Sequence, residues 1–124
     1  MEAARSPRLA PYLVVNDARG LVKFIEGTLD GKLGYHHDRP DGTLMHAEVR
    51  IADSLVMVAD SPSGRDVFPA MIHLYVTDAD ASFERALKAG ASEVQKPATA
   101  PDGDRRGGVQ DKWGNQWWFT SLRG

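Results

Sequence analysis

The sequence predicts an α+β fold in which two βαβββ modules follow one another along the chain. Two observations lead to this prediction. First, residues 101–121 repeat residues 40–60, and the Pro-Asp-Gly turn that opens both stretches recurs without a gap at an offset of 61. Second, each half follows the order strand, helix, strand, strand, strand, and the same offset relates Val94 to Leu33. We interpret the halves as an internal duplication, and the alternative is a chance match of two similar patterns.

The first half predicts one helix among four strands. Apolar residues at helical spacing, with charged residues between them, indicate an amphipathic helix over residues 17–28, with Asn16 and Asp17 as candidates for its N-cap. Runs of apolar and β-branched residues predict the strands. These cover residues 9–15, 31–37, 43–51 and 54–60.

The second half repeats this order. A helix is expected over residues 78–88, and Gly90 suits the left-handed position that ends it. Strands are expected over residues 70–76, 92–98, 104–111 and 115–122. The chain is therefore divided into a frayed N-terminus, a first module, a turn-rich linker and a second module. Their bounds are residues 1–8, 9–60, 61–69 and 70–122.

The composition excludes several classes of function. The 124 residues include 15 Lys and Arg against 17 Asp and Glu, a net charge of −2, which disfavours nucleic acid and anionic membranes as partners. There is no cysteine, so disulfides and thiolate metal sites are excluded. No signal peptide is recognisable, and no apolar run approaches the roughly 18 residues that span a bilayer. We expect a soluble cytoplasmic protein.

Three motifs carry a resemblance to a known family. APYLVVND opens the first module, HLYVTDADASFERALKAGA opens the second, and GDRRGGVQDKWGNQWW closes it. With the tandem βαβββ pattern, they resemble the vicinal oxygen chelate superfamily, which includes glyoxalase I, ring-cleaving dioxygenases and bleomycin resistance proteins. The resemblance implies that each module curls a mixed sheet around a concave cleft. It also implies a homodimer, in which modules exchanged between subunits can complete the site.

The resemblance further implies metal ligands on the first and last strand of each module in the enzymes of this family. The matching positions here hold Ala10, Met57, Met71 and Trp118. None of these side chains offers an imidazole, carboxylate or amide ligand to a cation. We therefore expect no metal and no cofactor, and a protein without catalytic residues is favoured over an enzyme.

Strand alternation assigns the side chains of the expected cleft, because successive residues point to opposite faces. It gives Trp117 to the core and Trp118 to the cleft. On the third strands it places His46, Glu48 and Arg50 opposite Gly107, Val109 and Asp111 of the second copy. The candidate ligand-binding residues are Tyr12, His46, Glu48, Arg50, Met57, Met71, His73, Tyr75, Gly107, Gly108, Trp113, Gln116 and Trp118.

Several of these residues have a second interpretation. Trp118 can be core or subunit interface, and Trp113 is expected at the cleft rim. Gly107 and Gly108 either let a ligand approach Trp118 or form a bulge. Arg105 and Arg106 can bind a ligand carboxylate, although a salt bridge is the simpler expectation.

The mixture of aromatic, methionine and few polar groups is typical of a site for a planar organic molecule. The favoured hypothesis is a protein that sequesters an aromatic ligand, for example an antibiotic, without changing it. The alternative is a metal-dependent enzyme of the glyoxalase or dioxygenase type, using His46, His73 and Glu48 on adjoining strands. A third hypothesis is a metal-free acid–base site at His46 or His73.

Overall fold

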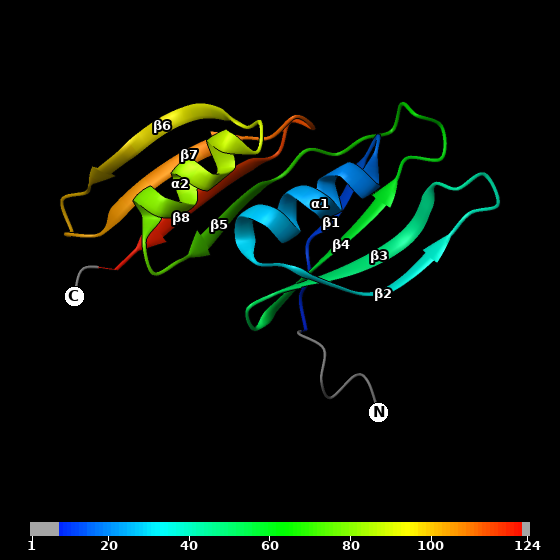
Figure 1. Ribbon diagram of the computed structural model, residues 1–124, viewed down its shortest axis with the longest axis horizontal. Helices are drawn as coiled ribbons and strands as arrows, with labels where there is room; N and C mark the ends of the chain where they lie inside the picture. The colour runs from blue at the N-terminus through cyan, green and yellow to red at the C-terminus, as the bar shows by residue number, and fades with distance from the viewer. Residues whose placement is uncertain (1–7, 123–124) are drawn as a thin grey trace. The chain divides into compact units, whose positions relative to one another are not determined.

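The computed structural model describes residues 8–122, and it has the predicted α+β fold. The chain divides into two compact units, with the boundary between Phe68 and Pro69. Each unit is a four-stranded mixed sheet with one helix on one of its faces (Figure 1). The expected frayed segment falls on residues 1–7, outside the described residues, and on Arg8.

The first module contains one helix and a sheet of four strands in the order β1-β4-β3-β2. The strands β1 and β4 are parallel, and the other neighbours are antiparallel. The elements are β1 (Tyr12–Val15), α1 (Ala18–Leu29), β2 (Lys32–Asp38), β3 (Leu44–Ile51) and β4 (Ser54–Asp60).

The second module repeats this topology in the strand order β5-β8-β7-β6, with β5 and β8 parallel. Its elements are β5 (Met71–Tyr75), α2 (Ala79–Lys88), β6 (Ser92–Thr99), β7 (Arg105–Gln110) and β8 (Gln116–Ser121). Among residues 8–122, no helix is long and apolar enough to cross a membrane.

The first strand is shorter than the sequence predicts. It begins at Tyr12 instead of residue 9, because Pro11 has no amide hydrogen for a strand ladder. The Pro11 carbonyl still accepts a bond from the Met57 amide at 2.8 Å. Leu9 lies before the strand and is 82% exposed.

The helix ends follow from their capping residues. Asp17 caps α1, and its carboxylate accepts a bond from the Gly20 amide at 3.1 Å. At the end of α2, Gly90 has the predicted left-handed conformation, with φ of 106°. The amides of Gly90 and Ala91 return to the carbonyls of Leu87 and Ala86, which is a Schellman motif.

The repeated Pro-Asp-Gly sequence makes the same hairpin turn in both modules. Gly42 and Gly103 have φ of 91° and 94°, and each amide bonds back to a carbonyl three residues earlier at 2.9 Å. In each turn the aspartate, Asp41 or Asp102, accepts an amide bond from the residue two positions later at 2.9 Å. The duplication is therefore visible in the backbone bonding as well as in the sequence.

The offset between the copies is not constant, which corrects part of the prediction. Trp117 pairs with Val109 as Val56 pairs with Val49, so the fourth strands keep an offset of 61 while the third strands have an offset of 60. Val49 pairs with Leu33, and Val109 pairs with Glu93, so the counterpart of Leu33 is Glu93 and not Val94.

Two changes of one residue begin and end the shift of the third strands. The first module has one extra residue at Met45, where the pairing of β2 with β3 is irregular between His37 and Asp38. The second module has one extra residue in the hairpin loop between β7 and β8. That loop is closed by the bond from the Asp111 amide to the Asn115 carbonyl at 2.8 Å.

Each module buries an apolar core on the face of the sheet that carries the helix. In the first module Leu13, Ala47, Val49 and Val58 are fully buried, as strand alternation predicts. In the second module, fully buried side chains of the same face include Val109, Trp117 and Phe119. The opposite face of each sheet, which we call the helix-free face, carries most of the candidate site residues.

Candidate functional site on the helix-free sheet faces

Trp118 is the largest side chain on the helix-free face of the second module. It is partly exposed, whereas its neighbour Trp117 is fully buried, so the two indoles lie on opposite faces of β8. The Trp118 Nε1–H donates to Gln116 Oε1 at 3.0 Å. Gly108 lies opposite Trp118 on β7. An indole that contacts backbone on one side and bonds at its edge is held in a fixed orientation.

The two adjacent glycines of β7 serve different neighbours. A methyl group at Gly108 would lie 2.7 Å from Trp118 Cδ2, so only glycine leaves room for the indole. A methyl group at Gly107 would lie 3.0 Å from Pro97 Cγ. The pairing of β6 with β7 is irregular between Gln95 and Ala98, so Pro97 belongs to a bulge of β6. The glycine pair therefore accommodates both an indole and a bulge.

Three more predicted residues accompany Trp118 on this face. Met71 and Tyr75 are 70% and 71% exposed at the two ends of β5. His73 lies between them, with its ring centroid 5.2 Å from that of Tyr75. Its Nε2 is 2.6 Å from the hydroxyl of the buried Thr120. The second module thus offers aromatic and thioether surfaces with one imidazole among them.

The first module has a more polar helix-free face, where three side chains form a hydrogen-bonded row. Tyr12 Oη lies 3.1 Å from His46 Nδ1, and His46 Nε2 lies 3.2 Å from Glu48 Oε2. Tyr12 and His46 also pack ring against ring, with centroids 5.6 Å apart. Tyr35 approaches His46 from β2 at a centroid distance of 6.1 Å. The sequence does not reveal Tyr35, because its face depends on the irregular pairing of β2.

Met57 stands at the centre of this face. It is the pairing partner of Tyr12 on one side and of Glu48 on the other. Arg50 lies two residues beyond Glu48 on β3, on the same face, and is exposed. Ala10 precedes β1 and is partly exposed.

Three predicted relationships on the third strands are wrong. Val109 is fully buried and pairs with Trp117, so it belongs to the helix side. Gly107 pairs with the buried Phe119 and shares that side. Asp111 is buried in a turn. The cause is the offset of 60 in these strands, because a shift of one residue moves a side chain to the other face.

His46 and His73 do not lie on adjoining strands, which corrects the basis of the proposed metal site. His46 is on β3 of one sheet, and His73 is on β5 of the other. Within residues 8–122, no group of three or more His, Asp or Glu side chains is arranged to hold a metal ion.

Asp111 organises the hairpin turn before β8. Its carboxylate accepts bonds from the amides of Trp113 and Asn115 at 2.9 Å and from Trp117 Nε1 at 2.8 Å. Asn115, which is fully buried, in turn accepts a bond from the Ala70 amide at 3.0 Å. This network fixes the start of β5 and β8 and positions Trp113 as a partly exposed residue of the turn.

The adjacent Arg105 and Arg106 form salt bridges, as the simpler of the two interpretations predicts. Arg105 Nε and Nη2 each lie 3.1 Å from a carboxylate oxygen of Asp80, which ties β7 to α2. Arg106 Nη2 lies 2.9 Å from Asp102 Oδ2 within the hairpin. Hydrogen bonding to Asp80 raises the pKa of Arg105.

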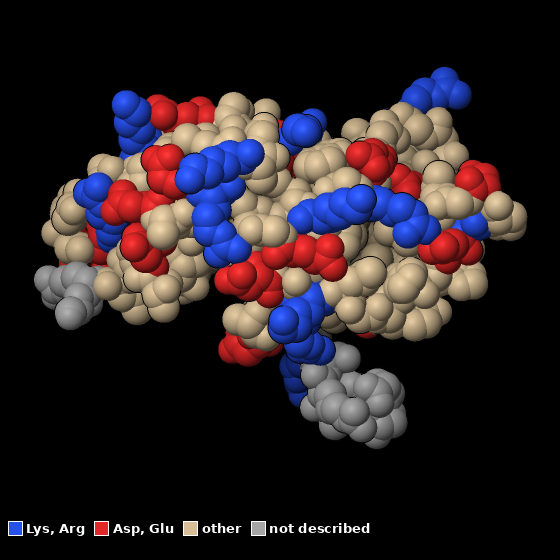
Figure 2. Space-filling view, in the orientation of Figure 1, with Lys and Arg blue, Asp and Glu red and all other residues tan. Residues whose placement is uncertain are grey.

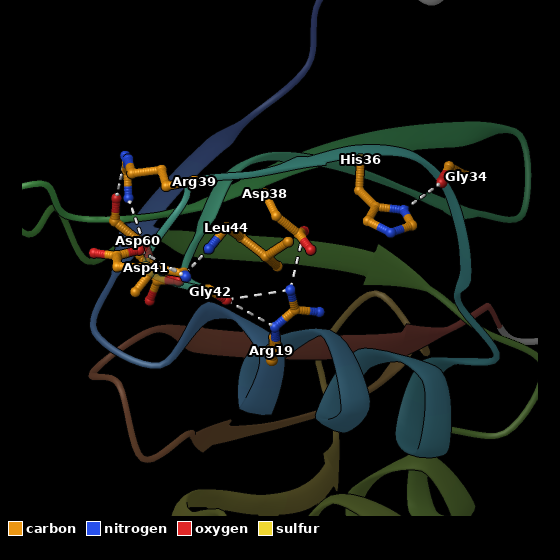
Figure 3. A network of polar contacts seen from close by, with 10 residues as sticks. Arg19, Gly34, His36, Asp38, Arg39, Asp41, Gly42, Leu44 and Asp60 are labelled. Carbon is orange, nitrogen blue, oxygen red and sulfur yellow. Dashed lines mark hydrogen bonds and ion pairs between the residues drawn. The ribbon is translucent and has the colours of Figure 1, made fainter.

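A separate polar network covers the helix side of the first module (Figure 3). Arg19 of α1 reaches the Asp38 carboxylate at 2.9 Å and the Gly42 carbonyl at 3.2 Å. Asp60 accepts bonds from the amides of Ala18 and Leu44, both at 2.8 Å. These bonds tie α1 to the ends of β3 and β4, so we assign them a structural role.

A small pocket of about 130 Å³ adjoins this network. It lies between α1 and the strands β2 and β3, away from the predicted site residues. It is lined by Arg19, Val22, Lys23, Glu26, Leu33 and Leu44. On the face drawn in Figure 2, basic and acidic side chains are interspersed, in keeping with the nearly balanced charge.

Two tandem βαβββ modules with open sheets, each with a helix-free face, define a protein of the vicinal oxygen chelate fold. The chain belongs to the Glyoxalase/Bleomycin resistance protein/Dioxygenase superfamily, whose family model matches residues 7–119.

Comparisons with individual proteins agree with this assignment. The chain is 38% identical over 122 residues to the uncharacterized protein Rv0887c of Mycobacterium tuberculosis, covering 90% of this chain and 72% of that protein. It resembles the crystal structure of TioX from Micromonospora sp. ML1 with a TM-score of 0.79 and 25% identity, covering 94% of this chain and 99% of TioX. It shares its fold with the fosfomycin resistance protein FosX from Mesorhizobium loti, with a TM-score of 0.68, 19% identity and coverage of 93% and 91%.

Proposed function

We propose that this protein binds a planar aromatic small molecule on its helix-free sheet faces and sequesters it without changing it. The observation that carries the proposal is the fixed indole of Trp118, which contacts Gly108 and leaves part of its surface exposed. Met71 and Tyr75 extend this apolar surface on β5. Exposed apolar side chains that gather on one face of a small protein are typical of an interaction site.

The family gives this proposal a context. The superfamily name includes a bleomycin resistance protein, and FosX is named for fosfomycin resistance. An antibiotic is therefore one class of ligand to include in a search. The four positions that the resemblance assigns to metal ligands hold Ala10, Met57, Met71 and Trp118, none of which offers an imidazole, carboxylate or amide ligand. This composition favours binding over metal catalysis.

We also propose that the protein is a homodimer, in which modules from two subunits contribute to one site. Analytical ultracentrifugation with and without ligand tests this part of the proposal. A monomer at micromolar concentration in both states would contradict it.

The binding proposal is tested by titrating a panel of aromatic natural products, antibiotics included, while tryptophan fluorescence is recorded. A ligand should quench the emission of the wild type, and Trp118→Phe should bind it about fivefold to tenfold more weakly, because a well-placed aromatic contact contributes about 1 kcal/mol. Trp113→Phe provides the comparison, since Trp113 is predicted at the cleft rim and lies in the turn before β8, so its loss should weaken binding less than the loss of Trp118.

The fate of the ligand separates sequestration from catalysis. After binding, the ligand is released by denaturation and its mass is measured. Recovery of the unchanged molecule after long incubation supports sequestration. A modified molecule, formed in proportion to the amount of protein, would show that the protein is an enzyme.

A further inference from the structure

The hydrogen-bonded row of the first module has a defined direction. The ionised Glu48 carboxylate only accepts hydrogen bonds, so His46 Nε2 must carry the hydrogen that it donates over 3.2 Å. The Nδ1 atom of a neutral imidazole with this tautomer is an acceptor. When His46 is neutral, Tyr12 Oη, 3.1 Å away, is therefore the donor of the next bond.

This direction decides what the row offers to a ligand. The single hydrogen of the Tyr12 hydroxyl points to His46, so the outward lone pairs of Tyr12 Oη can only accept. The second oxygen of Glu48 is also an acceptor. Both side chains are accessible, since Tyr12 is 44% exposed and the Glu48 side chain is 38% exposed. The helix-free face of the first module therefore presents hydrogen-bond acceptors at Tyr12 and Glu48.

The acceptors are set in a surface that suits an aromatic ring. Met57 lies between Tyr12 and Glu48 in the strand pairing, and its thioether can adapt to a flat ligand. Tyr35 is 64% exposed and lies beside His46, where its ring adds a second aromatic surface.

We propose that Tyr12, His46 and Glu48 form an acceptor site that selects aromatic ligands carrying a hydroxyl or N–H donor. The inference rests on the proposed binding function and deepens it by naming the polar group of the ligand. His46 acts as a positioning residue, because it fixes the direction of the Tyr12 hydroxyl. Glu48 orients His46 with one oxygen and offers the other oxygen to the ligand as an acceptor. Methylation of the ligand's donor should therefore weaken its binding at this face.

The experiment compares 2-naphthol with 2-methoxynaphthalene, which share a ring system and differ in one donor. Each is titrated into protein labelled with ¹³C at the methionine methyl groups, so Met57 reports on the first module and Met71 on the second. At Met57, 2-naphthol should bind about fivefold more tightly, the effect of one net hydrogen bond. Equal affinities, a preference for the methoxy compound, or no shift at Met57 from either probe would each overturn the proposal.

Two variants identify the acceptors. Combining Tyr12→Phe with Glu48→Leu removes both acceptors that face the ligand and keeps the aromatic surface, so 2-naphthol and 2-methoxynaphthalene should then bind with about equal affinity. The matched control combines Tyr75→Phe with His73→Phe in the second module, and it should keep the preference at Met57. A preference that survives the first pair of substitutions would contradict the assignment.

The tautomer is tested without any ligand. Nitrogen-15 NMR of the histidine rings should show the hydrogen of neutral His46 on Nε2, and Glu48→Leu should remove this bias. Hydrogen on Nδ1 in the wild type would overturn the inference. If Met71 and Trp118 respond to ligands while Met57 does not, the acceptor site is wrong and the proposed function stands. If Met57 discriminates the probes while no ligand perturbs Met71 or Trp118, the site in the second module is wrong instead.

Discussion

Gly108 and Trp118 face each other across β7 and β8, and a methyl group added at Gly108 would lie 2.7 Å from the indole. The glycine is therefore a condition for the indole to lie flat on the sheet. This relationship joins the two parts of the closing motif that the sequence presents separately, the glycine pair and the tryptophan pair.

Gly108→Ala is expected to displace the Trp118 indole and to destabilise the protein by about 1 to 3 kcal/mol, the usual effect of overpacking. Denaturant unfolding measures the change in free energy, and a shift of the tryptophan emission that is absent in a Trp118→Phe background reports the displacement. An alanine variant with unchanged stability and unchanged emission would show that the indole does not lie against β7.

Gly27→Ala should have the opposite effect on stability. Gly27 lies in α1, and an added methyl group would meet no atom within 4 Å. Alanine is favoured over glycine inside a helix by about 0.5 to 1 kcal/mol, so the variant should be more stable by that amount. Thermal unfolding measured beside Gly108→Ala provides the comparison. A loss of stability would mean that the open face of α1 is covered in solution.

Asp111→Ala should destabilise the second module by about 3 kcal/mol, because Trp117 Nε1 and the Asn115 amide would lose a buried acceptor. Asp111→Asn keeps one acceptor oxygen and should destabilise the second module less. Asp53→Ala, in the exposed turn of the first module, is the control and should change stability by no more than about 0.5 kcal/mol. Equal effects at Asp111 and Asp53 would contradict the structural role of Asp111.

The duplicated hairpin turns predict a common response to acid. Bonds from Thr43 lower the pKa of Asp41 below 3.8, and the Asp104 amide and Arg106 lower that of Asp102. A carboxylate with a lowered pKa in the folded state stabilises it above the ordinary value, and this stability is lost as the pH falls through the folded value. Replacing both aspartates by asparagine should reduce the fall in urea midpoint between about pH 5 and about pH 3. If the fall in urea midpoint is unchanged in this variant, other carboxylates cause the loss of stability in acid.

Asp80→Asn tests the assignment of Arg105 to a salt bridge. The pair is exposed, with side-chain accessibilities of 41% and 53%, so its loss should change stability by less than about 1 kcal/mol. Ligand affinity, measured by fluorescence titration, should stay the same. A tenfold change in affinity would indicate that Arg105 contacts the ligand.

The sequence predicts the fold almost completely, because hydrophobic period, caps and the repeated turn are local signals. Gly90 and the two Pro-Asp-Gly turns are recognisable without a structure for this reason. The candidate site is predicted where strands are regular, as for Trp117 and Trp118. It is mispredicted for Val109, because a residue added in a bulge and another in a loop change the register without leaving a local signal. Tyr35 is missed for the same reason.

The paired one-residue changes, at Met45 and in the loop after Asp111, matter for anyone who grafts residues between the copies. If a site residue of β3 is moved to β7 by the offset of 61 that aligns the turns, its side chain points to the opposite face of the sheet, into the core. Counting 60 residues instead carries Glu48 to Gly108 and Val49 to Val109, and each keeps its face. Residues can therefore be exchanged between the two modules in redesign, provided that positions on the third strands are matched by their strand pairing.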